Sequence, residues 1–142
     1  MGHVRFLVFY LLVGLGGAAA HVLSDPSSMV PVVGASGAIS GIMGAYLLLY
    51  PRIRIQTLFF LFIFIRIAAV PAWFVLVFWF ATQLLAGYTD SVAQAGVAFW
   101  AHIGGFAAGV VLVKLFENRE LVRARSVRVA SGPAGWGRRL ND

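Results

Sequence analysis

The sequence predicts an all-α membrane protein, a polytopic bundle of transmembrane helices with about four spans. Of its 142 residues, 61% are hydrophobic and only 11% are charged, which is far from the usual mix of a soluble domain. The apolar residues also gather in runs of roughly the length that crosses a bilayer, separated by turn-forming or basic segments. We therefore expect the lipid bilayer to be the main environment of this chain.

Charge and cysteine content exclude several classes of function. The formal net charge is +6, but the basic residues flank apolar runs or follow Glu117, a pattern of membrane topology and not of nucleic-acid binding. With no cysteine there is no disulfide framework and no cysteine nucleophile. Three scattered histidines and no acidic residue inside an apolar run predict neither a metal site nor a cofactor.

Two apolar runs in the first third of the chain predict two membrane-spanning helices. The first covers residues 6–22 and is followed by turn-forming residues at 24–28. Its basic start, leucine-rich middle and alanine-rich end also resemble a signal peptide, which is left open as an alternative. The second span begins near Gly34 and ends at Tyr50, because Pro51 stops the helix.

The pattern changes between the second and third spans. Residues 52–70 alternate and are rich in β-branched and aromatic side chains, which favours extended structure at the membrane interface. A single helix over 57–86 is the alternative, but it would place Arg66 inside the hydrocarbon at a cost of about 2.5–3.5 kcal/mol. We therefore begin the third span near Pro71, which suits a first helical turn, and end it at Ala86.

The fourth span extends from about Ala98 to Phe116 and completes a transmembrane domain over residues 1–116. Residues 117–142 are rich in arginine and are predicted to form a basic, disordered or surface-bound cytoplasmic tail. The loops at 24–33 and 87–97 contain no lysine or arginine. The positive-inside rule therefore places both loops outside and both termini in the cytoplasm.

Ser36 and His102 are candidate catalytic residues, because each begins an apolar run that follows an outside loop. A serine hydroxyl needs a base within about 2.6–3.2 Å, and histidine is the usual choice. No carboxylate lies at that depth, so the unit must be a dyad, with the Ser36 and Gly37 amides as natural oxyanion donors. Taken singly, Ser36 is better explained as a small residue at a helix–helix contact, and for His102 a structural hydrogen bond and a catalytic role are equally supported. Because both residues lie at the same depth, the pair favours catalysis.

Small residues recur at helical spacing on the second and fourth spans, which lets two helix backbones approach closely in lipid. Close approach is what a serine and a histidine need to share a hydrogen bond. These residues are Gly37, Gly41 and Gly44 on the second span, and Ala101, Gly105 and Gly109 on the fourth. Trp79 on the third span is interpreted as a packing or lipid-facing residue, with a substrate gate as the alternative.

Gly34-Ala35-Ser36-Gly37 opening one span, and the run from Ala101 to Phe106 opening another, resemble the rhomboid family of intramembrane serine proteases. The resemblance covers roughly residues 4–116 and includes Val70-Pro71-Ala72-Trp73. It implies a rhomboid-like fold with Ser36 as nucleophile, His102 as general base, and Gly34 and Gly37 as backbone support for the oxyanion. The implied substrates are transmembrane segments of other proteins, cleaved near the outer face of a bacterial or archaeal plasma membrane.

The chain departs from the family's pattern at three points. Rhomboid proteases have at least six spans, and this sequence begins at what corresponds to the third, so we expect Met1 to be an internal methionine of a longer reading frame. The family's His-x-x-x-Asn pattern, which helps to stabilise the oxyanion, does not occur here. Ser40 stands where the family often has an aromatic residue against the imidazole. An inactive rhomboid-like protein that binds transmembrane clients is therefore the alternative function.

Overall fold

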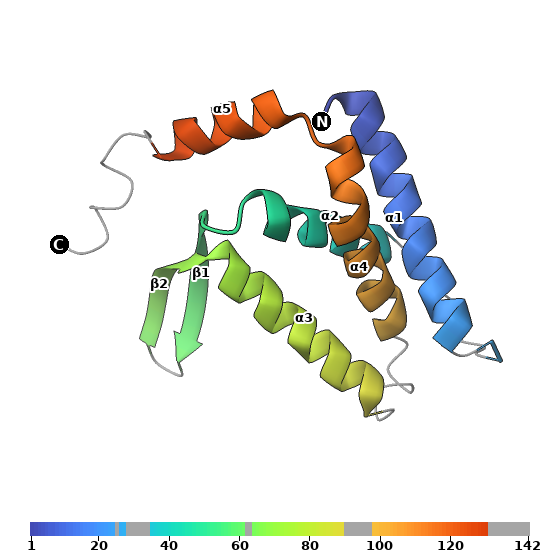
Figure 1. Cartoon of the computed structure of the whole chain (residues 1–142). Helices are drawn as coiled ribbons and strands as arrows, with labels where there is room; N and C mark the ends of the chain where they lie inside the picture. Colours follow the sequence, from blue (N-terminus) through green and yellow to red (C-terminus); the bar gives the residue numbers. More distant parts are fainter. Residues whose placement is uncertain (25, 28–34, 62–63, 90–97, 131–142) are drawn as a thin grey trace.

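The computed structural model describes residues 1–24, 26–27, 35–61, 64–89 and 98–130. Within these ranges each predicted apolar span forms a helix, and a β-hairpin separates the second from the third (Figure 1). The elements are α1 (His3–Ser24), α2 (Ser36–Leu49), β1 (Arg54–Leu61), β2 (Phe64–Pro71), α3 (Ala72–Tyr88), α4 (Phe99–Phe116) and α5 (Arg119–Ala130).

The helices differ in their capacity to cross a membrane. By length and composition, α1 and α4 are long and apolar enough to span it, whereas α2 and α3 are apolar but shorter. The predicted helical class is confirmed for the bundle, although the hairpin means that all-α does not describe the whole chain. The total of four spans stays a prediction.

Helices α1, α2 and α4 meet at Gly41 of α2. A Cβ atom built on this glycine would lie 2.5 Å from the Val13 side chain of α1 and 2.9 Å from the Gly105 carbonyl oxygen of α4. Only a hydrogen atom fits between three helices at this distance. The buried core surrounding the contact contains Phe9, Val13, Ala38, Ala45 and Val113.

The contacts between α2 and α4 show that the two helices run in the same direction. Gly37, near the start of α2, faces Ala101 near the start of α4, and Gly44 faces Phe106 further along. Helix α1 runs the opposite way, because its later residue Gly17 also faces Ala101. The starts of α2 and α4 therefore lie at one end of the bundle, together with the end of α1.

Most of α1 presents apolar side chains to its surroundings. Only a narrow stripe of this helix is buried, formed by Phe9, Val13 and Gly17. Leu15 is 66% exposed and Leu23 is 80% exposed. A helix that is apolar on all sides requires an apolar environment, as lipid provides. Because the stripe belongs to the core, the packing favours a retained span over a removed signal peptide.

Strands β1 and β2 pair as an antiparallel hairpin that extends away from α1 and α4 (Figure 1). The extended structure predicted for this region is confirmed, and the single helix over 57–86 is wrong. Helix α3 begins at Ala72, so Pro71 lies just before the first turn and not within it. The amides of Ala72 and Trp73 donate to the carbonyls of Ile53 at 2.7 Å and Pro51 at 3.1 Å, which satisfies two donors that a helix start leaves free.

Helix α5 occupies part of the segment that was predicted to form a disordered or surface-bound tail. Residues 119–130 are helical, and the Asn118 side-chain oxygen accepts hydrogen bonds from the amides of Glu120 at 3.1 Å and Leu121 at 3.2 Å. Asparagine is a strong N-cap, and the arginine content of the segment does not indicate this local signal. The remainder of the predicted tail, 131–142, lies outside the described residues.

Candidate active site

Ser36 and His102 lie at the same end of the bundle, on neighbouring helices. Ser36 is the first residue of α2 and is exposed, whereas His102 lies in the first turn of α4 and is half-buried. Their chain neighbours Gly37 and Ala101 are in contact, since a Cβ atom on Gly37 would lie 3.3 Å from the Ala101 carbonyl oxygen. Among the described residues no hydrogen bond joins the Ser36 and His102 side chains. Catalytic hydrogen bonds often tighten only when substrate is bound.

Glycines set the separation of α2 and α4 beside these two residues. A Cβ atom on Gly105 would collide with the carbonyl of Gly37, and one on Gly109 would collide with the carbonyl of Gly41. Gly44 packs in the same way against the Phe106 carbonyl. Any larger side chain at these positions would force the helices apart and separate Ser36 from His102.

The start of α2 presents backbone donors beside Ser36 that have no acceptor within the helix. Ala35 occupies the N-cap position, and its side chain makes no capping hydrogen bond. The first helical bond runs from the Ile39 amide to the Ala35 carbonyl at 2.8 Å. The amides of Ser36, Gly37 and Ala38 precede that bond, so they have no partner within the helix and suit a developing negative charge. Gly34, the other predicted support, lies outside the described residues.

Gln83 of α3 is a third polar side chain at this end, and sequence reasoning missed it. Its Oε1 atom lies 2.8 Å from Nδ1 of His102, and the residue is only 9% exposed. An amide side chain here takes the place beside the histidine that a carboxylate holds in a serine protease triad. The available signal was an amide side chain within an otherwise largely apolar helix, α3.

Aromatic rings flank the imidazole of His102. The ring of Trp79 on α3 lies 5.9 Å from it between centroids, and the ring of Phe99 on α4 lies 6.3 Å away in an edge-on arrangement. Trp79 also contacts Phe106, at 6.2 Å between centroids. These contacts support the interpretation of Trp79 as a packing residue.

The comparison with known families identifies the chain. A family model described as Rhomboid domain matches residues 1–119, a range that includes α1 to α4. The chain belongs to the rhomboid family. Rhomboid proteins are intramembrane serine proteases that act on transmembrane substrates, and membership agrees with the apolar helices of an integral membrane protein. Searches of curated proteins and of solved structures find no match.

In this rhomboid protein Ser40 does not replace the missing aromatic residue, because it faces the backbone. It is 2% exposed, and its hydroxyl donates to the Ser36 carbonyl oxygen at 2.8 Å. The aromatic surface against His102 comes instead from Trp79 and Phe99. The imidazole therefore has aromatic support from α3 and from its own helix α4, and not from α2 as the family's pattern indicated.

Replacing Trp79 with alanine is expected to slow any reaction that depends on His102 by about 2- to 10-fold, the equivalent of one aromatic contact of about 0.5–1.5 kcal/mol. Trp79→Phe keeps an aromatic ring and should retain most of the rate. Trp73→Ala is the matched control, because Trp73 is 48% exposed and packs at the start of α3 on Phe74. Equal rates for Trp79→Ala and wild type, measured with a fluorogenic transmembrane peptide, would contradict this role.

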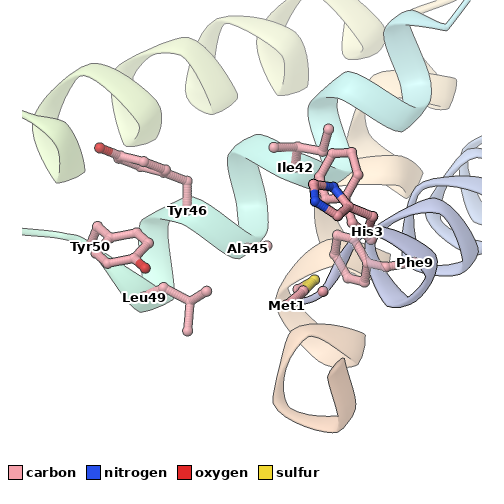
Figure 2. Close-up of a pocket in the computed structure, with 10 residues that line it drawn as sticks. Met1, His3, Phe9, Ile42, Ala45, Tyr46, Leu49 and Tyr50 are labelled. Atoms are coloured by element: carbon pink, nitrogen blue, oxygen red, sulfur yellow. The ribbon is translucent and has the colours of Figure 1, made fainter. Parts of the chain in front are cut away.

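A cavity of about 290 Å³ lies at the opposite end of α2 from Ser36. Figure 2 shows side chains from the start of α1 and from the end of α2 around it. Its lining includes Met1, His3, Phe9, Ile42, Tyr46 and Leu49. Because Ser36 and Leu49 are the two ends of α2, this cavity is separate from the candidate active site. Within the described ranges no group of three or more His, Cys, Asp or Glu side chains is placed to hold a metal ion.

Proposed function

We propose that this rhomboid protein is an intramembrane serine endopeptidase in which Ser36 is the nucleophile and His102 is the general base. The observation that carries the proposal is the glycine contact between α2 and α4, which places both residues at one end of the bundle. The second support is the family membership.

The reaction follows from the groups at this end. His102 takes the proton of the Ser36 hydroxyl as the oxygen attacks the carbonyl carbon of the scissile peptide bond. The amides of Ser36 and Gly37 donate to the oxyanion of the tetrahedral intermediate, with Gly34 as a further backbone support. His102 then gives the proton to the leaving amine, and water hydrolyses the resulting ester of Ser36 by the same steps.

The charges of the bundle support an orientation in which this site opens toward the outer face. The rings of Phe9 and Phe116 lie 5.6 Å apart at the opposite end, next to the basic side chains of Lys114 and Arg119. Lys114 and Arg119 both contact Glu117 there, at 3.7 Å and 3.5 Å. The positive-inside rule places that end in the cytoplasm, with both termini. The substrates are then transmembrane segments cleaved near the outer face of a bacterial or archaeal plasma membrane.

The proposal is tested by reconstituting the full chain in liposomes with a fluorescent single-span reporter protein. Two products are expected, and mass spectrometry of the fragments should place the cut near the outer end of the reporter span. A set of reporters with helix-destabilising residues at different depths locates the cut relative to the membrane. Intact reporters throughout, with the chain folded, would contradict protease activity.

Client binding without cleavage is the second candidate function. It is favoured by the hydrogen bonding of His102, whose side chain bonds to Gln83, while no hydrogen bond between described residues joins it to Ser36. Co-purification separates the two functions. A binding protein retains intact reporter in both wild type and Ser36→Ala, whereas a protease retains it only in the variant and releases fragments in wild type.

A further inference from the structure

The hydrogen bond between Gln83 and His102 joins α3 to α4, the helix that carries the candidate base. Gln83 belongs to α3 and His102 to α4, and their side chains meet at 2.8 Å between Oε1 and Nδ1. A buried amide inside an apolar helix is unfavourable unless it is hydrogen-bonded. The Gln83 side chain contacts Nδ1 of His102 and not Nε2. The role of Gln83 therefore depends on which of the two side chains donates the proton of this hydrogen bond.

Hydrogen bonds along α3 support the orientation in which the oxygen of the Gln83 amide faces the histidine. The Thr82 hydroxyl donates its proton to the Trp79 carbonyl at 2.6 Å, so its oxygen is left as an acceptor. The Gln83 Nε2 group donates to that oxygen at 3.4 Å. This leaves the Gln83 Oε1 atom, which is only an acceptor, opposite His102. Nδ1 of His102 must therefore carry the proton of the hydrogen bond.

We propose that Gln83 is a positioning residue that holds neutral His102 in the Nδ1–H tautomer and leaves the lone pair on Nε2 to accept the Ser36 proton. This inference rests on the proposed protease function and extends it to a third side chain. The partner of a catalytic histidine sets its tautomer and orientation, a role that a carboxylate fills in the serine protease triad. An amide oxygen supplies the same acceptor without the cost of a carboxylate in the hydrocarbon.

The ring contacts complete the positioning. Trp79, one turn before Gln83 on α3, contacts the imidazole at 5.9 Å, and Phe99 contacts it edge-on at 6.3 Å. The rings limit where the imidazole can lie, and the Gln83 hydrogen bond selects which nitrogen points away from α3. The two effects are distinguishable, because only the second depends on an acceptor atom.

The test measures the ¹⁵N chemical shifts of His102 in the full chain labelled with ¹⁵N-histidine, assigned by comparison with His102→Ala. Wild type is expected to show a protonated Nδ1 and an unprotonated Nε2 in the neutral ring. Gln83→Met keeps the length and removes the acceptor, so a shift toward the Nε2–H tautomer is expected. Gln83→Glu restores an acceptor and should restore the wild-type pattern once its carboxyl group is ionised.

Kinetics on the same variants report the functional consequence. Gln83→Met is expected to lower kcat for reporter cleavage on the order of 10- to 100-fold with KM nearly unchanged, the range seen when the outer partner of a metal-bound histidine is removed. Gln83→Glu is expected to recover most of this loss. A packing role alone predicts the reverse order, since methionine is the better apolar substitute. Gln56→Met is the matched control, because Gln56 is exposed on β1.

The experiments distinguish a failure of the protease function from a failure of the role of Gln83. If wild type cleaves no reporter, the protease function is wrong, whatever the tautomer. If wild type cleaves but its His102 has an unprotonated Nδ1, or if Gln83→Met changes neither the shifts nor kcat, the role of Gln83 is overturned. The wild-type spectrum alone decides the tautomer if Gln83→Met does not fold.

Discussion

Replacing Ser36 with alanine is expected to lower the rate of reporter cleavage on the order of 10⁴-fold or more. The variant loses the only atom proposed to form the covalent bond to substrate, and removal of a nucleophile from a serine protease has effects of this size. The measurement is the single-turnover rate of fragment release in liposomes. Cleavage by Ser36→Ala at the wild-type rate would show that another group performs the reaction.

Ser40→Ala is the matched control for this substitution. Ser40 lies one turn further along α2, and its hydroxyl donates to the Ser36 carbonyl at 2.8 Å. Removing that hydrogen bond should destabilise the fold by about 0.5–1.5 kcal/mol, with less than a 10-fold effect on the cleavage rate. If Ser40→Ala lowered the cleavage rate as much as Ser36→Ala does, the rate would depend on the conformation of the start of α2 and not on a nucleophile at Ser36.

Replacing Gly105 with alanine is the second change with a large expected effect. The new methyl group would collide with the backbone of Gly37, and backbone yields less readily than a flexible side chain. Overpacking of this kind costs about 1–3 kcal/mol of folding free energy. If the helices separate by about 1 Å to relieve it, the cleavage rate should fall on the order of 10²-fold, because the reacting groups are misplaced.

Gly87→Ala is the matched control, because it makes the same change at a glycine with space for a methyl group. A Cβ atom on Gly87 of α3 would have its nearest neighbour at 3.4 Å, an atom at the end of the Ile103 side chain. Gly87→Ala should therefore leave both the unfolding temperature in detergent and the cleavage rate close to wild type. Equal unfolding temperatures for Gly105→Ala and Gly87→Ala would contradict the close contact between α2 and α4.

The main helices could be predicted from sequence because each consists of an apolar run that ends at a polar, basic or proline-containing segment. The hairpin was also predictable, since its alternation and Arg66 conflict with a membrane helix. Helix α5 was not predicted, because composition suggested disorder and the local signal was a single N-cap residue, Asn118. Charge content describes a segment's solubility better than its backbone conformation.

The site was predictable to the extent that it depends on topology. Helices α2 and α4 both start at one end, and the glycine spacing indicated that they can approach closely, so Ser36 and His102 could be singled out. The contacts of Gln83 and Trp79 with His102 could not be predicted, because they depend on how α3 rotates against α4. Helix α3 is apolar on most sides, so its sequence does not indicate which face meets the histidine.

The most direct test of the central claim is labelling of the purified full chain with a fluorophosphonate, which reacts with activated serines. We predict covalent modification that mass spectrometry maps to Ser36, and that disappears in both Ser36→Ala and His102→Ala. Ser40→Ala should still be labelled. A folded wild-type chain that resists the probe, or labelling that persists in His102→Ala, would contradict the proposal that His102 activates Ser36.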